Sequence, residues 1–97
     1  MFELIIKTLA EDDIRDAVDW YSKISSELKQ EFVDALEQKF KSLVENPVQY
    51  QKRYEEIRVI FTEKFPYGIY FTIESSTVYV HAILHTKRNP QIGISRI

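Results

Sequence analysis

The chain has 97 residues, 44% of them hydrophobic and 13% aromatic, so it can form one domain, residues 1–97, around one modest core. Thirteen basic and fifteen acidic side chains give a formal net charge of −2, which argues against indiscriminate nucleic-acid binding by a strongly basic surface. The absence of cysteine excludes disulfides, thiolate zinc sites and a cysteine nucleophile; with no membrane-length apolar window and no secretory signal, we expect a cytoplasmic protein.

The N-terminal half predicts one short strand and two helices. Phe2–Lys7 is an apolar run of strand length, and Thr8 with Glu11 matches a capping box that predicts a helix start with Thr8 as N-cap. Apolar residues then recur on one helical face: Ile14, Ala17, Val18, Tyr21 and Ile24. Ser25-Ser26 can cap a second helix, which Asn46-Pro47 ends. Its apolar face is Leu28, Phe32, Leu36, Phe40 and Leu43. The short connection predicts an antiparallel helical hairpin.

The C-terminal half predicts a polar loop over Val48–Tyr54 and then three strands. The strands are Ile57–Thr62, Tyr67–Glu74 and Thr77–His85, with a tight turn at Ser75-Ser76. Gln91–Ile97 is expected to be a loosely ordered tail. The order β-α-α-β-β-β predicts an α+β fold in which the hairpin covers one face of an antiparallel sheet, the last three strands forming a meander. The side chains expected to be buried are Phe32, Leu36, Phe40, Val59, Phe71 and Val80.

The most informative stretch follows the last predicted strand. An imidazole, two cations, an amide and a proline occur together there, in His85-Thr86-Lys87-Arg88-Asn89-Pro90. Loops at strand ends are where a rigid scaffold presents functional side chains. The charge is also uneven, because residues 1–50 carry 6 basic and 11 acidic side chains whereas residues 51–97 carry 7 and 4. This skew indicates either two differently solvated halves or a basic functional end on an acidic helical body.

Several short motifs occur along the chain in a fixed order. They are Ala17-Val18-Asp19-Trp20-Tyr21, Leu43-Val44-Glu45-Asn46-Pro47, Ile57-Arg58, Phe65-Pro66-Tyr67-Gly68-Ile69-Tyr70-Phe71 and His85-Thr86-Lys87-Arg88-Asn89-Pro90. In this order and spacing they resemble the RelE/ParE superfamily of toxins over nearly the whole chain. The last motif resembles the H-x-x-R-[DN]-P ending of ParE-like members of the plasmid-stabilisation type.

The resemblance implies the toxin component of a type II toxin–antitoxin module, neutralised by a cognate antitoxin. It leaves three modes of action open. ParE-like members poison DNA gyrase by protein binding, and this is our main reading. RelE-like members cut messenger RNA on the ribosome. A third reading is an inactive relative that only binds antitoxin. The oligomeric state stays open.

The nuclease reading assigns chemistry to two residues. RNA cleavage by a 2′-hydroxyl needs a base, an acid and cations for the developing phosphorane charge. Arg58 matches the strand arginine that contacts the scissile phosphate in RelE-like nucleases, and His85 could transfer protons because imidazole titrates near neutral pH. The alternatives are an ion pair of Arg58 with Glu55, Glu56 or Glu63, and a hydrogen bond of His85 to the backbone.

Further candidates are recognition residues. The cations Lys87, Arg88, Lys52 and Arg53 could bind a target or a phosphate, or form solvated charged turns. Trp20 and Tyr21 are candidates for antitoxin binding. Active RelE-like nucleases commonly present a tyrosine near the C-terminus, but no aromatic residue follows Pro90 here, which disfavours the nuclease. We expect no metal site and no cofactor, because two histidines on one strand without a carboxylate pair do not form a ligand set.

Overall fold

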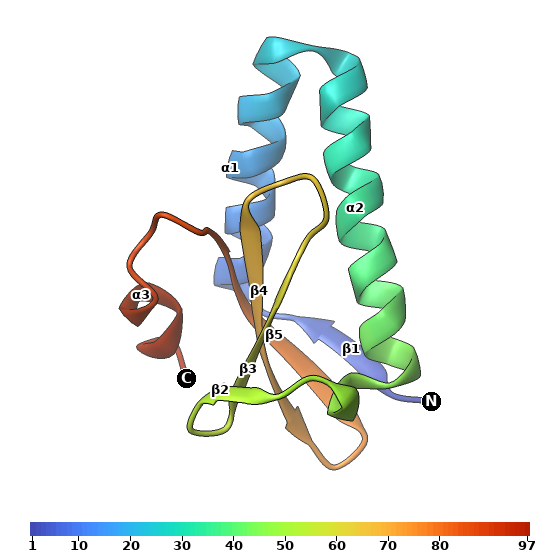
Figure 1. Cartoon of the computed structure of the whole chain (residues 1–97), viewed down its shortest axis with the longest axis vertical. Helices are drawn as coiled ribbons and strands as arrows, with labels where there is room; N and C mark the ends of the chain where they lie inside the picture. Colours follow the sequence, from blue (N-terminus) through green and yellow to red (C-terminus); the bar gives the residue numbers. More distant parts are fainter.

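A computed structural model describes all 97 residues, 1–97, and has the predicted α+β architecture (Figure 1). The elements in chain order are β1 (Glu3–Ile6), α1 (Thr8–Ile24), α2 (Ser26–Glu45), a 3-10 turn η1 (Pro47–Gln49), β2 (Lys52–Tyr54), β3 (Ile57–Phe61), β4 (Tyr67–Glu74), β5 (Thr77–His85) and α3 (Gln91–Ile94). The hairpin of α1 and α2 packs on one face of the sheet and projects well beyond it. No helix is long and apolar enough to cross a membrane.

The sheet has five strands in the order β1-β5-β4-β3-β2, and it is mixed. The last three strands form the predicted antiparallel meander, but β1 pairs with β5 in parallel. The expectation of a wholly antiparallel sheet was therefore wrong. β1 and β5 are far apart in the chain, so no short turn sets their relative direction, and the helical hairpin between them supplies the crossover.

The starts of the two long helices differ from each other. Ser25 caps α2 as predicted, because its Oγ accepts a 3.0 Å hydrogen bond from the Leu28 N–H. The capping box at Thr8 was wrong, since Lys7 occupies the N-cap position and no side chain caps α1. The reason is that Lys7 still pairs with β5, donating its N–H to the Val80 carbonyl at 2.9 Å. The strand thus runs directly into the helix, and Thr8 is already helical.

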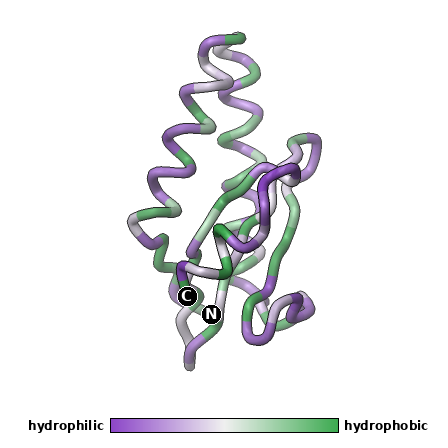
Figure 2. The backbone as a smooth tube through the Cα atoms, turned by 90° about the vertical axis from the view of Figure 1, so that its left-hand side faces the viewer, coloured by the Kyte–Doolittle hydropathy of each residue, from purple (hydrophilic) through white to green (hydrophobic).

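The main core lies between the hairpin and the sheet. Five of the six side chains expected to be buried are buried, although Val59 is on the other face of the sheet, and Phe40 is only partly buried. At the centre of this core Tyr21 contacts Phe32 and Phe65, with 5.0 Å and 5.1 Å between the ring centroids, respectively. Figure 2 shows the alternation of hydrophobic and hydrophilic residues along both helices that produces this buried face.

A second apolar cluster occupies the opposite face of the sheet. It contains Ile57, Val59, Tyr70, Ala82 and Leu84, and α3 covers it with Ile92 and Ile94. Burial of Ile92 and Ile94 against this cluster stabilises the docking of α3 on the sheet.

Two expectations for the connecting segments were wrong. The tail over Gln91–Ile97 holds a helical turn, whose Gly93 lies so close to Tyr70 that a Cβ would meet the ring at 2.9 Å. The predicted loop over Val48–Tyr54 contains the last two residues of η1 and the edge strand β2. Both segments are too short to show a hydrophobic period of their own.

Candidate functional site

The two predicted catalytic residues lie apart on the sheet, with Arg58 level with the middle of β5 and His85 at the end of β5. Arg58 is aligned with Phe71 on β4, whereas His85 is aligned with Tyr67 on the same strand. Four residues of β4 separate the two positions, about 13 Å at about 3.3 Å per residue, and Arg58 and His85 also flank β4 on different sides. A single scissile phosphate therefore does not lie between them.

The cations near Arg58 are engaged in structural contacts. Arg58 donates from Nε to the Tyr50 carbonyl oxygen at 2.7 Å, a contact that holds the segment after η1 against the sheet. It forms none of the ion pairs considered from the sequence. Lys52 forms a 2.9 Å salt bridge with Glu56, and the Arg53 guanidinium lies 5.2 Å from the Phe61 ring centroid.

The other end of the sheet gathers most of the remaining predicted residues. A shallow groove of about 140 Å³, called here the Trp20 groove, runs between α1 and the end of β5. Its walls include Asp13, Ala17, Trp20, Tyr67, His85 and Arg88. The side chain of Trp20 is 62% exposed, whereas Tyr21 is 9% exposed and packs in the core. Trp20 thus stays a candidate for partner contact, while Tyr21 is placed with the core side chains.

His85 organises the loop that bears the two cations. Its Nδ1 accepts a 3.1 Å hydrogen bond from the Lys87 N–H, and its carbonyl oxygen accepts one from the Arg88 N–H at 2.9 Å. Because Nδ1 is an acceptor, the neutral ring carries its proton on Nε2. Lys87 and Arg88 are exposed, and neither forms a salt bridge. The loop therefore presents two free cations beside the groove.

Tyr67, on the floor of this region, is unsuited to act as a base. Its ring meets the edge of the His85 ring with 5.4 Å between centroids. Burial raises the pKa of the Tyr67 hydroxyl, and the neighbouring Tyr21 raises it further, while Arg88 opposes the change. The hydroxyl is therefore protonated at neutral pH.

The ion pair between Asp13 and Arg96 was not predicted from the sequence. The Asp13 carboxylate accepts hydrogen bonds from the Ile83 N–H at 2.9 Å and from Arg96 Nη1 at 2.6 Å. Arg96 Nη1 also donates to the His81 carbonyl oxygen at 3.0 Å. Both charged side chains are largely buried, with 15% of Asp13 and 17% of Arg96 exposed. A signal was present, since Asp13 precedes the buried Ala17 by four residues on the same helical face.

A β-bulge in β5 lies next to this ion pair. Tyr70 is aligned with Ala82 and Phe71 with Val80, so His81 is an extra residue in β5. Its Nε2 lies 2.8 Å from Thr72 Oγ1 in a hydrogen bond. Burial lowers the pKa of His81 and the positive charge of Lys7 lowers it further, while Glu74 opposes them.

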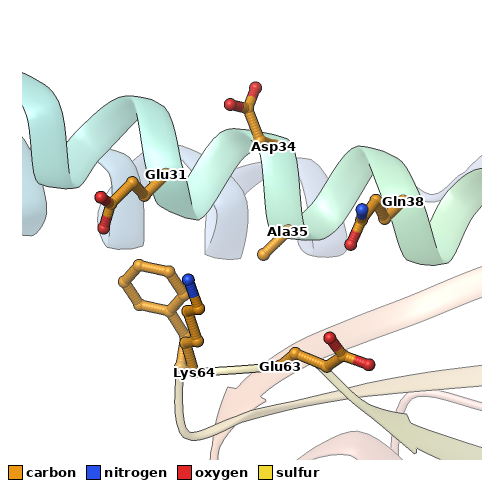
Figure 3. Close-up of a pocket in the computed structure, with 7 residues that line it drawn as sticks. Glu31, Asp34, Ala35, Gln38, Glu63 and Lys64 are labelled. Atoms are coloured by element: carbon orange, nitrogen blue, oxygen red, sulfur yellow. The ribbon is translucent and has the colours of Figure 1, made fainter.

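A larger hollow lies between α2 and the loop that joins β3 to β4 (Figure 3). Its volume is about 300 Å³. Acidic side chains border it, Glu31 and Asp34 on the helix and Glu63 on the loop, and Lys64 extends from the loop towards the helix. Lys39 is 3.9 Å from Glu63 in a weak ion pair. None of the predicted site residues lines this hollow.

The family assignment follows from comparison with known proteins. The family model described as the ParE toxin of the type II toxin–antitoxin system parDE matches residues 4–90, which includes both the Trp20 groove and the cationic loop. The chain belongs to the ParE toxin family. The resemblance seen in the sequence motifs is thereby confirmed.

The fold of this ParE family member also matches a solved structure. That structure is a chromosomal ParDE toxin–antitoxin system from P. aeruginosa. The two share 20% sequence identity with a TM-score of 0.77, over 88% of this chain and 96% of the other. At this identity the likeness shows the fold alone. A search of the curated proteins finds no match.

The lowered pKa of His81 predicts a loss of stability in acid. Between this pKa and the ordinary value of 6.5, the unfolded chain binds more protons at this position than the folded chain does. The free energy of unfolding therefore falls as the pH is lowered through this window. We expect His81→Gln to lessen this fall, measured by urea unfolding at about pH 7.5 and about pH 5. His85→Gln is the control, and an equal fall in wild type and His81→Gln would contradict the prediction.

Proposed function

We propose that this chain is a ParE-like toxin that acts by binding a protein target of the DNA gyrase type and is neutralised by a cognate antitoxin. The observation that carries the proposal is the exposed indole of Trp20 across one groove from the unpaired cation Arg88, with the unpaired cation Lys87 next to Arg88 in the loop. Exposed tryptophan and arginine side chains are the types that most often dominate binding energy at protein interfaces. Free cations at the rim favour acidic partner surfaces.

The arrangement favours binding over RNA cleavage. Arg58 donates from Nε to the Tyr50 carbonyl oxygen, and it lies about 13 Å along β4 from the position of His85, at about 3.3 Å per residue. The Tyr67 hydroxyl is protonated, and no aromatic residue after Pro90 is available to stack on a base. His85, Tyr67 and the two loop cations lie together. Arg58, the cation that the resemblance assigns to the scissile phosphate, is not part of this group, whereas general acid–base catalysis requires all its groups around one point.

The groove also indicates the chemistry of its partner. Its floor and walls include the apolar surfaces of Ala17 and Trp20, and the free cation Arg88 lines it, with Lys87 next to Arg88 in the loop. The complementary segment would insert an apolar side chain and place acidic residues towards Lys87 and Arg88. We assign this segment to the antitoxin, whose binding would then cover the cations that the target needs.

Charge reversal tests the role of the cationic loop. We expect Lys87→Glu with Arg88→Glu to abolish growth inhibition on induced expression, because the loop would repel an acidic partner surface. Both side chains are exposed, so the free energy of unfolding should change by less than about 0.5 kcal/mol. Lys52→Glu with Arg53→Glu, two cations at the opposite end of the sheet, is the matched control and should leave toxicity unchanged.

The same strains distinguish the modes of action. Gyrase supercoiling and messenger RNA integrity are measured in parallel after induction. Loss of supercoiling with intact messenger, and a mild effect of His85→Ala, is the expected result. Messenger cleavage that His85→Ala abolishes would establish the endoribonuclease instead. Full toxicity of the double charge reversal would remove this loop from the mechanism, and no toxicity of the wild type would favour the inactive relative that only binds antitoxin.

Trp20 should dominate antitoxin affinity. We expect Trp20→Ala to raise the Kd of the purified pair at least about 30-fold, equivalent to about 2 kcal/mol, with a negative heat-capacity change for wild-type binding. Calorimetry on the purified chain and its cognate antitoxin measures both the Kd and the heat-capacity change. Ile24→Ala is the control, since Ile24 is 59% exposed on the same helix but does not line the groove. An equal effect of the two substitutions would contradict the assignment.

A further inference from the structure

The Asp13 carboxylate is bonded to both sides of the cationic loop. On one side it accepts the N–H of Ile83, two residues before His85. On the other side it binds the guanidinium of Arg96, which follows α3. The loop that bears Lys87 and Arg88 is therefore closed between two anchors that meet at one side chain of α1.

Apart from the packing of His85 on Tyr67 and of α3 on the second apolar cluster, two further hydrogen bonds involve the loop region. The Thr86 N–H donates to the Pro66 carbonyl oxygen at 2.8 Å, and the Asn89 Oδ1 accepts from the Gln91 N–H at 2.9 Å within the loop itself. Its two cations have no ionic partner. Its position relative to α1 depends on the docking of β5 and of the C-terminal segment.

We propose that Asp13 and Arg96 are a positioning pair that fixes Lys87 and Arg88 relative to Trp20 across the groove, an inference that rests on the proposed function. Asp13 and Trp20 lie on the same helix, and both line the groove. The pair therefore connects the cationic loop directly to the helix that carries the indole. A recognition surface held in one geometry before binding does not lose the corresponding conformational entropy on binding.

The geometry of the pair makes Arg96 hard to replace. Its Nη1 bonds to both Asp13 and the His81 carbonyl oxygen, and its Nη2 lies 3.3 Å from Asp13 Oδ1. The planar fork of arginine meets these acceptors together, whereas lysine offers a single ammonium. Arg96→Lys should thus keep the charge balance while weakening the attachment, and Arg96→Gln should remove the ionic contact.

The experiment uses the full chain with Arg96→Gln, Arg96→Lys and, as matched control, Asp12→Asn. Asp12 pairs with Arg15 on the exposed side of the same helix, so its loss tests a neighbouring ion pair that does not reach the loop. The first readout is the rate of trypsin cleavage after Lys87 and Arg88 under native conditions, which requires no toxicity. We expect about tenfold faster cleavage for Arg96→Gln, an intermediate rate for Arg96→Lys and no change for Asp12→Asn.

The second readout is growth inhibition at matched amounts of folded protein. Arg96→Gln should lose toxicity, Arg96→Lys should restore part of it, and combining Arg96→Gln with Lys87→Glu and Arg88→Glu should add no further loss. Unchanged cleavage, or faster cleavage with full toxicity, would overturn the proposal. If Arg96→Gln does not fold, Arg96→Lys decides by the same two criteria. If wild type is not toxic, the proposed function fails, and the cleavage rates alone decide whether the pair positions the loop.

Discussion

The buried ion pair between Asp13 and Arg96 is the contact on which the rest of the arrangement depends. It joins the first helix to the end of the chain and, through the Ile83 N–H, to the strand beside a β-bulge. Removing one partner of such a pair costs about 3–5 kcal/mol, because the other charge stays buried without compensation. The pair also satisfies two backbone groups of β5, the Ile83 N–H and the His81 carbonyl oxygen.

The cations outside this ion pair differ in whether they have a partner within the chain. Near β2 and β3, Arg58, Lys52 and Arg53 are bound to a carbonyl, a carboxylate and an aromatic ring. At the end of β5, Lys87 and Arg88 are free and lie beside an exposed tryptophan. Side chains that are already satisfied within the chain contribute to folding, whereas unpaired ones on an ordered loop are available for recognition. The chain belongs to the ParE toxin family, and this division is the basis of the proposed action by binding.

The helical hairpin, the meander and most of the core could be predicted from local sequence patterns, because the 3.6-residue hydrophobic period gives way to a period of two after Pro47. What could not be predicted depends on pairs distant in the chain. The parallel direction of β1 and the docking of α3 under Tyr70 have no local signature. Lys7 and not Thr8 is the N-cap residue of α1, because the Lys7 N–H is still bonded to the Val80 carbonyl oxygen of β5. Only part of the site could be predicted. The cations were identified from the sequence, but the distance between Arg58 and the loop after His85 could be known only from the strand register.

Backbone amide hydrogen exchange on the wild-type chain tests the central claim most directly. The account predicts that the Ile83 amide is protected as strongly as its neighbours in β5, and that the amides of Ile94 to Ile97 are protected together with it, since one carboxylate holds both segments. Exchange of the C-terminal amides at the rate of an unfolded chain, alongside a protected β5, would contradict it. The tail would then be free, and the cationic loop would lack its second anchor.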